Sequence, residues 1–284
     1  MSSEILANIN RIIPFSNVDG PGNRLAIFFQ SCPFSCLFCH NPETIHECLH
    51  CGKCVSRCPK EALKIVHGIV KWNEERCIQC DNCIHACPHL STPKVVSLSV
   101  SQILSKIKEV RPFICGITVS GGECMNQVSF LESLFSVLKK ENPSFSILID
   151  SNGAIDFEKH ASLLSLSDGV MLDVKAYNPM FHERITGISN NMVLKNLNYL
   201  LSINKLEEVR TVIFPNHLEE NEYTVKNVAK IIGDKTRYKL LRYRYYGVRE
   251  AGLKEFGKCF SPDKELLRCQ KLAIEYGCKN VVIV

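Results

Sequence analysis

The 284-residue sequence lacks the features that would direct it into or across a membrane. It contains no apolar run of about 18 residues, the length that predicts a transmembrane helix. Its first ten residues lack the basic-then-apolar pattern of a secretory signal peptide. We therefore expect a cytoplasmic protein with no membrane partner, in a compartment that keeps thiols reduced.

The sequence also lacks a strong excess of charge of one sign. Its formal net charge is +5, without the clustered basic stripe typical of nucleic-acid-binding proteins, so we expect no nucleic-acid partner. One basic stretch, residues 235–254, interleaves Lys and Arg with four tyrosines. This pattern favours an alternating strand followed by a solvated loop. Single-strand binding and a protein-docking edge are the alternatives.

Cysteine, by contrast, is abundant: there are 16, and eleven of them lie between Cys32 and Cys87 in three runs. The first run has only three thiols, spaced C-x3-C-x2-C: Cys32, Cys36 and Cys39. The other two runs have four thiols each, and a proline follows the last thiol of each. The spacing of one four-thiol run recurs in the other at a distance of 29 residues: Cys48, Cys51, Cys54, Cys58 and Cys77, Cys80, Cys83, Cys87. This is the spacing of bacterial ferredoxins with a pair of [4Fe–4S] clusters.

The three-thiol run favours an iron–sulfur cluster over the alternative, a zinc site. A structural zinc requires a fourth ligand, and His40 is poorly placed in the sequence to fold back and provide it. Three thiolates on a four-iron cluster would leave one iron open for chemistry, whereas four-thiol clusters are closed and pass electrons. The five remaining cysteines are expected to be packing residues: Cys115, Cys124, Cys259, Cys269 and Cys278.

The rest of the sequence alternates strand and helix patterns. The predicted strands are 24–30, 117–120, 147–150, 170–173, 209–214, 239–243 and 280–284, and the predicted helices are 101–110, 126–140, 157–166, 190–203, 223–232 and 263–276. This order predicts an α/β fold whose parallel sheet closes, or nearly closes, into a barrel. Residues 44–92, with a predicted hairpin at 62–72, form a separate ferredoxin-like α+β insert.

Polar residues follow four of the predicted strands. They are the Cys32 run, Gly121-Gly122-Glu123, Asp150-Ser151-Asn152-Gly153 and Asp173-Val174-Lys175. Because the carboxyl ends of parallel strands meet at one rim, we expect these segments to converge there. Taken alone, the glycine pair is typical of a turn and the aspartates of helix caps; the prediction of a site rests on their convergence.

These segments resemble radical S-adenosylmethionine (SAM) enzymes, and among them the activating enzymes of glycyl radical enzymes. The resemblance covers the whole chain. It rests on residues 19–24 (DGPGNR), the cysteine run with His40-Asn41-Pro42, and residues 119–123, 150–153, 171–175, 185–190 and 209–215. It implies a partial (β/α)6-type radical SAM barrel made of residues 1–43 and 93–284, interrupted by the insert at 44–92. Pyruvate formate-lyase activating enzyme is the simple form without an insert; this chain is most similar to the longer, YjjW-type branch.

The resemblance implies a role for each matching residue. Cys32, Cys36 and Cys39 would hold the catalytic cluster, while Cys48, Cys51, Cys54 and Cys87 would hold a second cluster and Cys77, Cys80, Cys83 and Cys58 a third. SAM would contact Phe38, Gly121, Gly122, Glu123, Asp173, Lys175, Arg210 and Arg244, the last standing where the family has a histidine. Asp150, Ser151, Met171 and Asp173 match positions that bind a monovalent cation, Na⁺ or K⁺. Cys124 stands where the family has a proline.

The implied activity is that of an oxidoreductase that activates glycyl radical enzymes. It cleaves SAM reductively to methionine and a 5′-deoxyadenosyl radical, which abstracts hydrogen from a glycine of the partner enzyme. The electron would come from a flavodoxin or a ferredoxin-type reductant. A radical SAM enzyme acting on a small molecule and a non-enzymatic iron–sulfur electron carrier are the alternatives.

Overall fold

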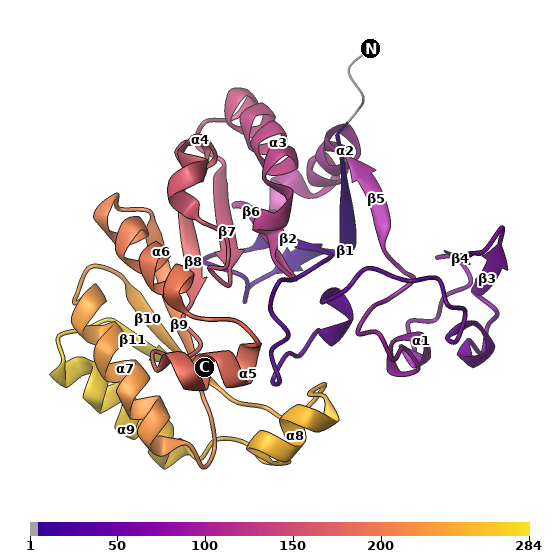
Figure 1. Ribbon diagram of the computed structural model, residues 1–284. Helices are drawn as coiled ribbons and strands as arrows, with labels where there is room; N and C mark the ends of the chain where they lie inside the picture. Colours follow the sequence, from indigo (N-terminus) through magenta and orange to yellow (C-terminus); the bar gives the residue numbers. More distant parts are fainter. Residues whose placement is uncertain (1–4) are drawn as a thin grey trace.

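The computed structural model describes residues 5–284 (Figure 1). The first four residues of the predicted 1–43 segment, which begin the stretch considered for a signal peptide, lie outside the described residues. Within residues 5–284, no helix is long and apolar enough to cross a bilayer.

The centre of the molecule is a nine-stranded sheet in the order β11-β10-β9-β8-β7-β6-β2-β1-β5. From β2 to β11 every neighbouring pair is parallel. The strands of this parallel part are β2 (Arg24–Phe29), β6 (Gly116–Gly121), β7 (Ser146–Ser151), β8 (Gly169–Asp173), β9 (Leu206–Ile213), β10 (Arg237–Arg242) and β11 (Val281–Ile283). All seven predicted strands are therefore present, and the prediction of an α/β fold with a parallel sheet is confirmed. The sheet is open, because β11 and β5 are separate edges.

Helices connect the parallel strands and lie around the outer side of the sheet in Figure 1. They are α2 (Val100–Val110), α3 (Val128–Glu141), α4 (Ala161–Leu166), α5 (Pro179–Thr186), α6 (Asn191–Ser202), α7 (Leu218–Ile232), α8 (Glu250–Phe256) and α9 (Asp263–Glu275). The longer helices bury apolar side chains on one face; α3, for example, buries Leu131, Leu134 and Phe135. The six predicted helices are confirmed, although α7 begins five residues earlier than predicted.

Four elements of the barrel are absent from the sequence-based prediction. Two are antiparallel strands at one edge, β1 (Leu6–Ser16) and β5 (Val96–Ser99), and two are the short helices α5 and α8. In β1, Asn and Arg interrupt the apolar residues, and register shifts break the pairing with β2, so its burial does not alternate cleanly. Short helices carry too few turns for a clear helical period.

The insert lies beside β1 and β5, at the right of Figure 1, and has its own small apolar cluster. It contains a hairpin of β3 (Leu63–Val66) and β4 (Ile69–Trp72), followed by α1 (Asn82–His85). The hairpin turns at His67-Gly68, as predicted, and both turn residues have positive φ (50° and 77°). At its base, the His46 N–H donates to the Leu90 carbonyl oxygen (3.1 Å), so the two chain ends of the insert lie together.

Candidate functional site

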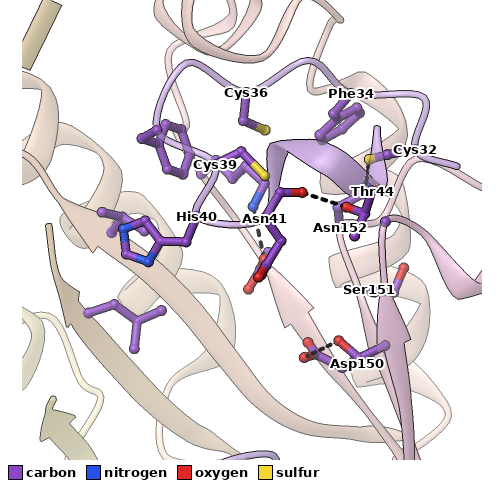
Figure 2. A pocket seen from close by; sticks show the side chains of 18 of the residues that line it. Cys32, Phe34, Cys36, Cys39, His40, Asn41, Thr44, Asp150, Ser151 and Asn152 are labelled. Carbon is purple, nitrogen blue, oxygen red and sulfur yellow. Dashed lines mark hydrogen bonds and ion pairs between the residues drawn. The ribbon is translucent and has the colours of Figure 1, made fainter. Parts of the chain in front are cut away.

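A cavity of about 530 Å³ opens where the polar segments after β2, β6, β7 and β8 converge. Its lining includes Cys32, Cys36, Cys39, Gly121, Gly122, Asp150, Ser151, Asn152, Asp173, Lys175, Phe38 and Arg244. Figure 2 shows the three cysteine side chains at one end of this pocket, with Asp150 and Ser151 further down the adjoining strand. The rim predicted from the strand order is therefore present.

The loop that carries the three cysteines is fixed by long-range contacts. The N–H groups of Ser35 and Leu37 donate to the last two carbonyl oxygens of α5 (2.8 Å each), which have no partner within the helix. Arg249, at the start of α8, donates to the carbonyl oxygens of Ser35 and Cys36 (2.9 Å each). Sequence analysis missed Arg249, because it placed the residue in a solvated loop; the alternating part of that stretch is confirmed as β10.

Burial raises the pKa of all three thiols, to about 12 for Cys36, although the Lys175 cation opposes this rise at each. Buried thiols in this state need a cationic metal centre to become thiolates. His40 also lines the cavity, but its Nε2 lies 2.8 Å from the Arg244 carbonyl oxygen. Three soft donors beside a large open space fit an iron–sulfur cluster that keeps one iron accessible.

Gly121 and Gly122 allow the end of β6 to lie in direct contact with the backbone of residues 29–31. Gly121 has φ +117°, and a Cβ there would lie 2.2 Å from the Phe29 nitrogen; a Cβ on Gly122 would lie 2.3 Å from the Ser31 carbonyl oxygen. Both residues press the end of β6 against the segment that leads into Cys32. Only glycine permits this approach, so the pair fixes the position of the cysteine loop as well as lining the cavity.

Asp173 and Lys175 lie two residues apart at the end of β8 and form an ion pair across the cavity wall (2.9 Å). Burial disfavours the Lys175 cation, but Asp173 and the nearby Cys36 raise its pKa, so Lys175 stays charged. Its ammonium group also lies 5.4 Å from the centre of the Phe38 ring. This wall presents one fixed cation, Lys175, which can bind a carboxylate, and one acidic side chain, Asp173, which can accept hydrogen bonds from hydroxyl groups.

Two residues predicted to contact SAM, Glu123 and Arg210, belong to buried polar networks. Glu123 is 1% exposed, and its carboxylate accepts hydrogen bonds from the Ser151 hydroxyl (2.9 Å) and the Asn152 N–H (2.8 Å). Burial raises the pKa of Glu123 to about 7. Arg210 pairs with the buried Glu208 (2.6 Å). Neither side chain lines the cavity, and the SAM contacts of both residues remain a prediction.

The residues predicted to bind a monovalent cation are close together but already engaged. Arg210 donates to a carboxylate oxygen of Asp150 and to the sulfur of Met171 (3.0 Å each). Asp150 also accepts from the Ser120 hydroxyl (3.0 Å). Across residues 5–284, no group of three or more His, Cys, Asp or Glu side chains has the arrangement of a single-ion site. The cation site remains a prediction.

In the insert, the structure gathers thiols from both runs. Cys58 of the first run lines a small cavity together with Cys77, Cys80 and Cys83 of the second, and Lys94 completes its wall. Cys48 lies within electrostatic range of Cys87 and Cys51, and Cys54 lies within range of Cys83, Cys48 and Cys87. The exchange of the fourth cysteine between runs, expected from the ferredoxin pattern, remains a prediction, and Cys58 is the cysteine of the first run that lies with three of the second.

The five other cysteines divide by burial. Cys124, Cys269 and Cys278 are buried, as expected for packing residues, whereas Cys115 and Cys259 are exposed. Packing therefore accounts for the three buried thiols and leaves the two exposed ones without a packing role.

Comparison with known proteins gives the family. A model of the radical SAM superfamily matches residues 26–230, and the chain therefore belongs to the radical SAM superfamily. A protein of Haemophilus influenzae, provisionally named a glycyl-radical enzyme activating enzyme, is 31% identical, covering 89% of this chain and 88% of its own. The pyruvate formate-lyase-activating enzyme of Streptococcus mutans is 27% identical over 86% of this chain and 81% of its own.

Solved structures agree on the fold. A radical SAM methyltransferase from Sphaerobacter thermophilus superimposes with a TM-score of 0.56 at 10% identity, covering 98% of this chain and 76% of that one. QueE from Escherichia coli gives a TM-score of 0.52 at 14% identity, covering 98% of this chain and 94% of its own. At this level of identity the likeness concerns architecture alone.

Proposed function

We propose that this chain is an activating enzyme for a glycyl radical enzyme. The observation that carries the proposal is that the relatives matched over nearly their whole length are activating enzymes, while the three cysteines of the superfamily line one cavity. When bound there, a [4Fe–4S] cluster and SAM would supply reductive cleavage of the sulfonium and removal of a hydrogen atom from a glycine of the partner. The large cavity has room for both groups.

The chain's own residues would bind and orient SAM. Cys32, Cys36 and Cys39 would hold the cluster at the closed end of the cavity. Lys175 and Asp173 would hold the carboxylate and the ribose of SAM. Phe38 lines the cavity with apolar surface. Its ring is held in place by an edge-on contact with Phe214 (ring centres 4.8 Å apart). Such walls exclude water from a reactive centre.

We further propose that the insert at 44–92 binds two more [4Fe–4S] clusters and belongs to the YjjW-type form of the family. The support is the grouping of four thiols around one cavity, with Cys58 donated across runs. A flavodoxin or ferredoxin-type reductant would then supply electrons through the insert, in the cytoplasm. The barrel would comprise 1–43 and 93–284.

The activity is tested by mixing the reconstituted, reduced protein and SAM anaerobically with candidate glycyl radical enzymes and recording electron paramagnetic resonance spectra. A glycine-centred doublet with one partner is expected. SAM cleavage without such a doublet for any partner encoded beside this chain would overturn the activase and favour a small-molecule radical enzyme. No SAM cleavage at all would favour an electron carrier.

The number of clusters is tested by iron analysis. The intact protein should bind about 12 irons and a Cys36→Ala variant about 8, because only the cluster with three ligands should lose its hold. The variant should also lose SAM cleavage while keeping the spectra of the insert. A matched Cys278→Ala variant, which alters a buried cysteine in the connection between α9 and β11, should keep all the iron. Equal iron in Cys36→Ala and the intact protein would contradict the assignment.

A further inference from the structure

The side chain of Asn152 makes a hydrogen bond to Cys32 that neither the sequence motifs nor the family comparison predicted. Its side-chain Nδ2 donates to the Cys32 sulfur at 3.3 Å, and the residue is 7% exposed. Figure 2 shows Asn152 beside Cys32 at the cavity wall. A hydrogen bond to a ligand sulfur is one of the means by which proteins set iron–sulfur potentials.

The orientation of this amide is fixed by its other end. The Ala154 N–H donates to the Asn152 Oδ1 (2.9 Å). Because a backbone N–H can only donate, the oxygen of the amide must face Ala154, and the NH₂ group must face the sulfur. The NH₂ group of Asn152 therefore donates a hydrogen bond to the Cys32 sulfur, and the opposite orientation of the amide would leave the Ala154 N–H without its acceptor.

The backbone of Asn152 is held in place by Glu123. The Asn152 N–H donates to one carboxylate oxygen of Glu123, and the Ser151 hydroxyl donates to the other (2.8 and 2.9 Å). Glu123 is in turn anchored to the cysteine loop, because its own N–H donates to the Ser31 carbonyl oxygen (2.8 Å). The end of β7 is thus tied to the residue preceding Cys32 through Glu123, whose carboxylate binds β7 and whose backbone N–H binds Ser31.

We propose that Asn152 raises the reduction potential of the cluster held by Cys32, Cys36 and Cys39, and that Glu123 positions Asn152 for this. Reduction adds one electron to the cluster, so its sulfurs become more negative and accept a stronger hydrogen bond. The amide therefore favours the reduced state. The inference rests on the proposed function, since it requires the cluster at these cysteines.

The first test uses the unaltered protein. With asparagine labelled by ¹⁵N in its side chain, pulsed electron paramagnetic resonance of the reduced, SAM-free protein should show a coupled ¹⁵N and an exchangeable proton. The cluster signal that changes when SAM is added identifies the catalytic cluster. A catalytic signal without these couplings would overturn this inference and leave the activase intact. Absence of any SAM-responsive signal would instead count against the proposed function.

The second test is a redox titration of variants. Asn152→Leu keeps the branching at Cγ but removes the donor, and should make one-electron reduction about tenfold less favourable, about 59 mV lower. Asn198→Leu is the matched control, because Asn198 lies on α6 and its side-chain amide donates to the Leu194 carbonyl oxygen (2.8 Å) rather than to sulfur. It should leave the potential unchanged. An equal shift in both variants would overturn the proposal.

The role of Glu123 is tested by Glu123→Asp, which keeps the charge but shortens the side chain. The potential should fall as in Asn152→Leu, and the double variant should show no further fall, because both changes act through one hydrogen bond. Additive shifts would show that Glu123 acts on the cluster independently of Asn152.

Discussion

His182 lies beneath the cysteine loop with its ring centre 5.6 Å from that of Phe34. It is fully buried, and its Nδ1 lies 2.7 Å from the Ile188 carbonyl oxygen. Burial lowers the pKa of His182 to about 4, from an ordinary value of 6.5. His182 is thus a neutral, buried side chain under the site. It lowers the free energy of unfolding only at acidic pH, where the unfolded chain is protonated at this residue.

We predict that stability falls as the pH is lowered through this range because of His182. Between pH 6.5 and about 4 the unfolded chain binds a proton that the folded chain does not, so unfolding becomes easier. At about pH 5 the loss should be about 2 kcal/mol relative to neutral pH, and His182→Gln should abolish it. Denaturant unfolding of both proteins at the two pH values measures this difference. The raised pKa of Glu123 makes its own contribution to folding stability increase as the pH falls. This contribution is the same in both proteins, so it cancels in their difference. Parallel pH profiles for the two proteins would contradict the prediction.

In the insert, Lys94 is a cation that lies beside the cysteines. It lines the cavity of Cys58 and Cys77, is 11% exposed, and pairs with Asp81 at 2.8 Å. Burial opposes its charge, but the Asp81 hydrogen bond and the nearby Cys83 raise its pKa, so it remains a cation. A fixed cation beside thiolates favours a more negative, reduced cluster.

Lys94→Met should therefore lower the potential of the cluster proposed at Cys58, Cys77, Cys80 and Cys83 by about 59 mV or more, a tenfold effect. Asp81→Asn should raise it, because the unpaired cation remains. Arg76→Met is the control, since Arg76 is 45% exposed and screened by water. Redox titration followed by paramagnetic resonance measures all three variants. Shifts of the same sign for Lys94→Met and Asp81→Asn would refute the electrostatic account.

At the scale of elements, α8 acts as a support for the cysteine loop. Arg249 at its start donates to the carbonyl oxygen of Cys36 (2.9 Å), and Gly252 one turn later lies against the loop. A Cβ on Gly252 would lie 2.0 Å from the Leu37 carbonyl oxygen. The helix was not predicted, yet it joins the C-terminal region to the loop near the start of the chain.

Gly252→Ala should destabilise the protein by about 1–3 kcal/mol, because backbone must move to admit one methyl group. The displaced loop should also bind less iron. Ala251→Ser, a change at an exposed position of the same helix, should stay within about 0.5 kcal/mol of the original protein. Denaturant unfolding and iron analysis test both variants. Full stability and iron in Gly252→Ala would show that α8 does not support the loop.

At the scale of the whole molecule, the predicted insert has its own apolar cluster and closely spaced chain ends. Its apolar cluster, which includes Leu63 and Val70, is distinct from the main core. Its two chain ends meet at the hydrogen bond between His46 and Leu90. A short connection can therefore replace it without stretching the barrel.

We predict that replacing residues 47–89 by a short Gly-Ser linker leaves a folded protein with about four irons. This shortened chain should cleave SAM when supplied with a strong chemical reductant, because the open cluster and its cavity lie in the barrel. The full-length protein prepared in parallel is the reference for yield, iron and cleavage. An iron-free or insoluble product would show that the barrel depends on the insert.

The sequence by itself determined the parallel strands, the helices between them and the cysteines at the site. These features depend on local patterns: apolar periodicity within an element and thiol spacing within a loop. They place Asp173 and Lys175 at strand ends without knowledge of the fold. The hairpin at His67-Gly68 is equally local, since two turn residues decide it.

The tertiary structure alone decided what the polar residues around the cysteines do. Glu123 belongs to a signature motif, and only the structure shows that its buried carboxylate accepts the backbone N–H of Asn152. Arg249 and Gly252 lie more than 200 residues from the loop they support. Such roles depend on atoms brought within about 3 Å by the packing of distant elements, and no pattern within one segment encodes those distances.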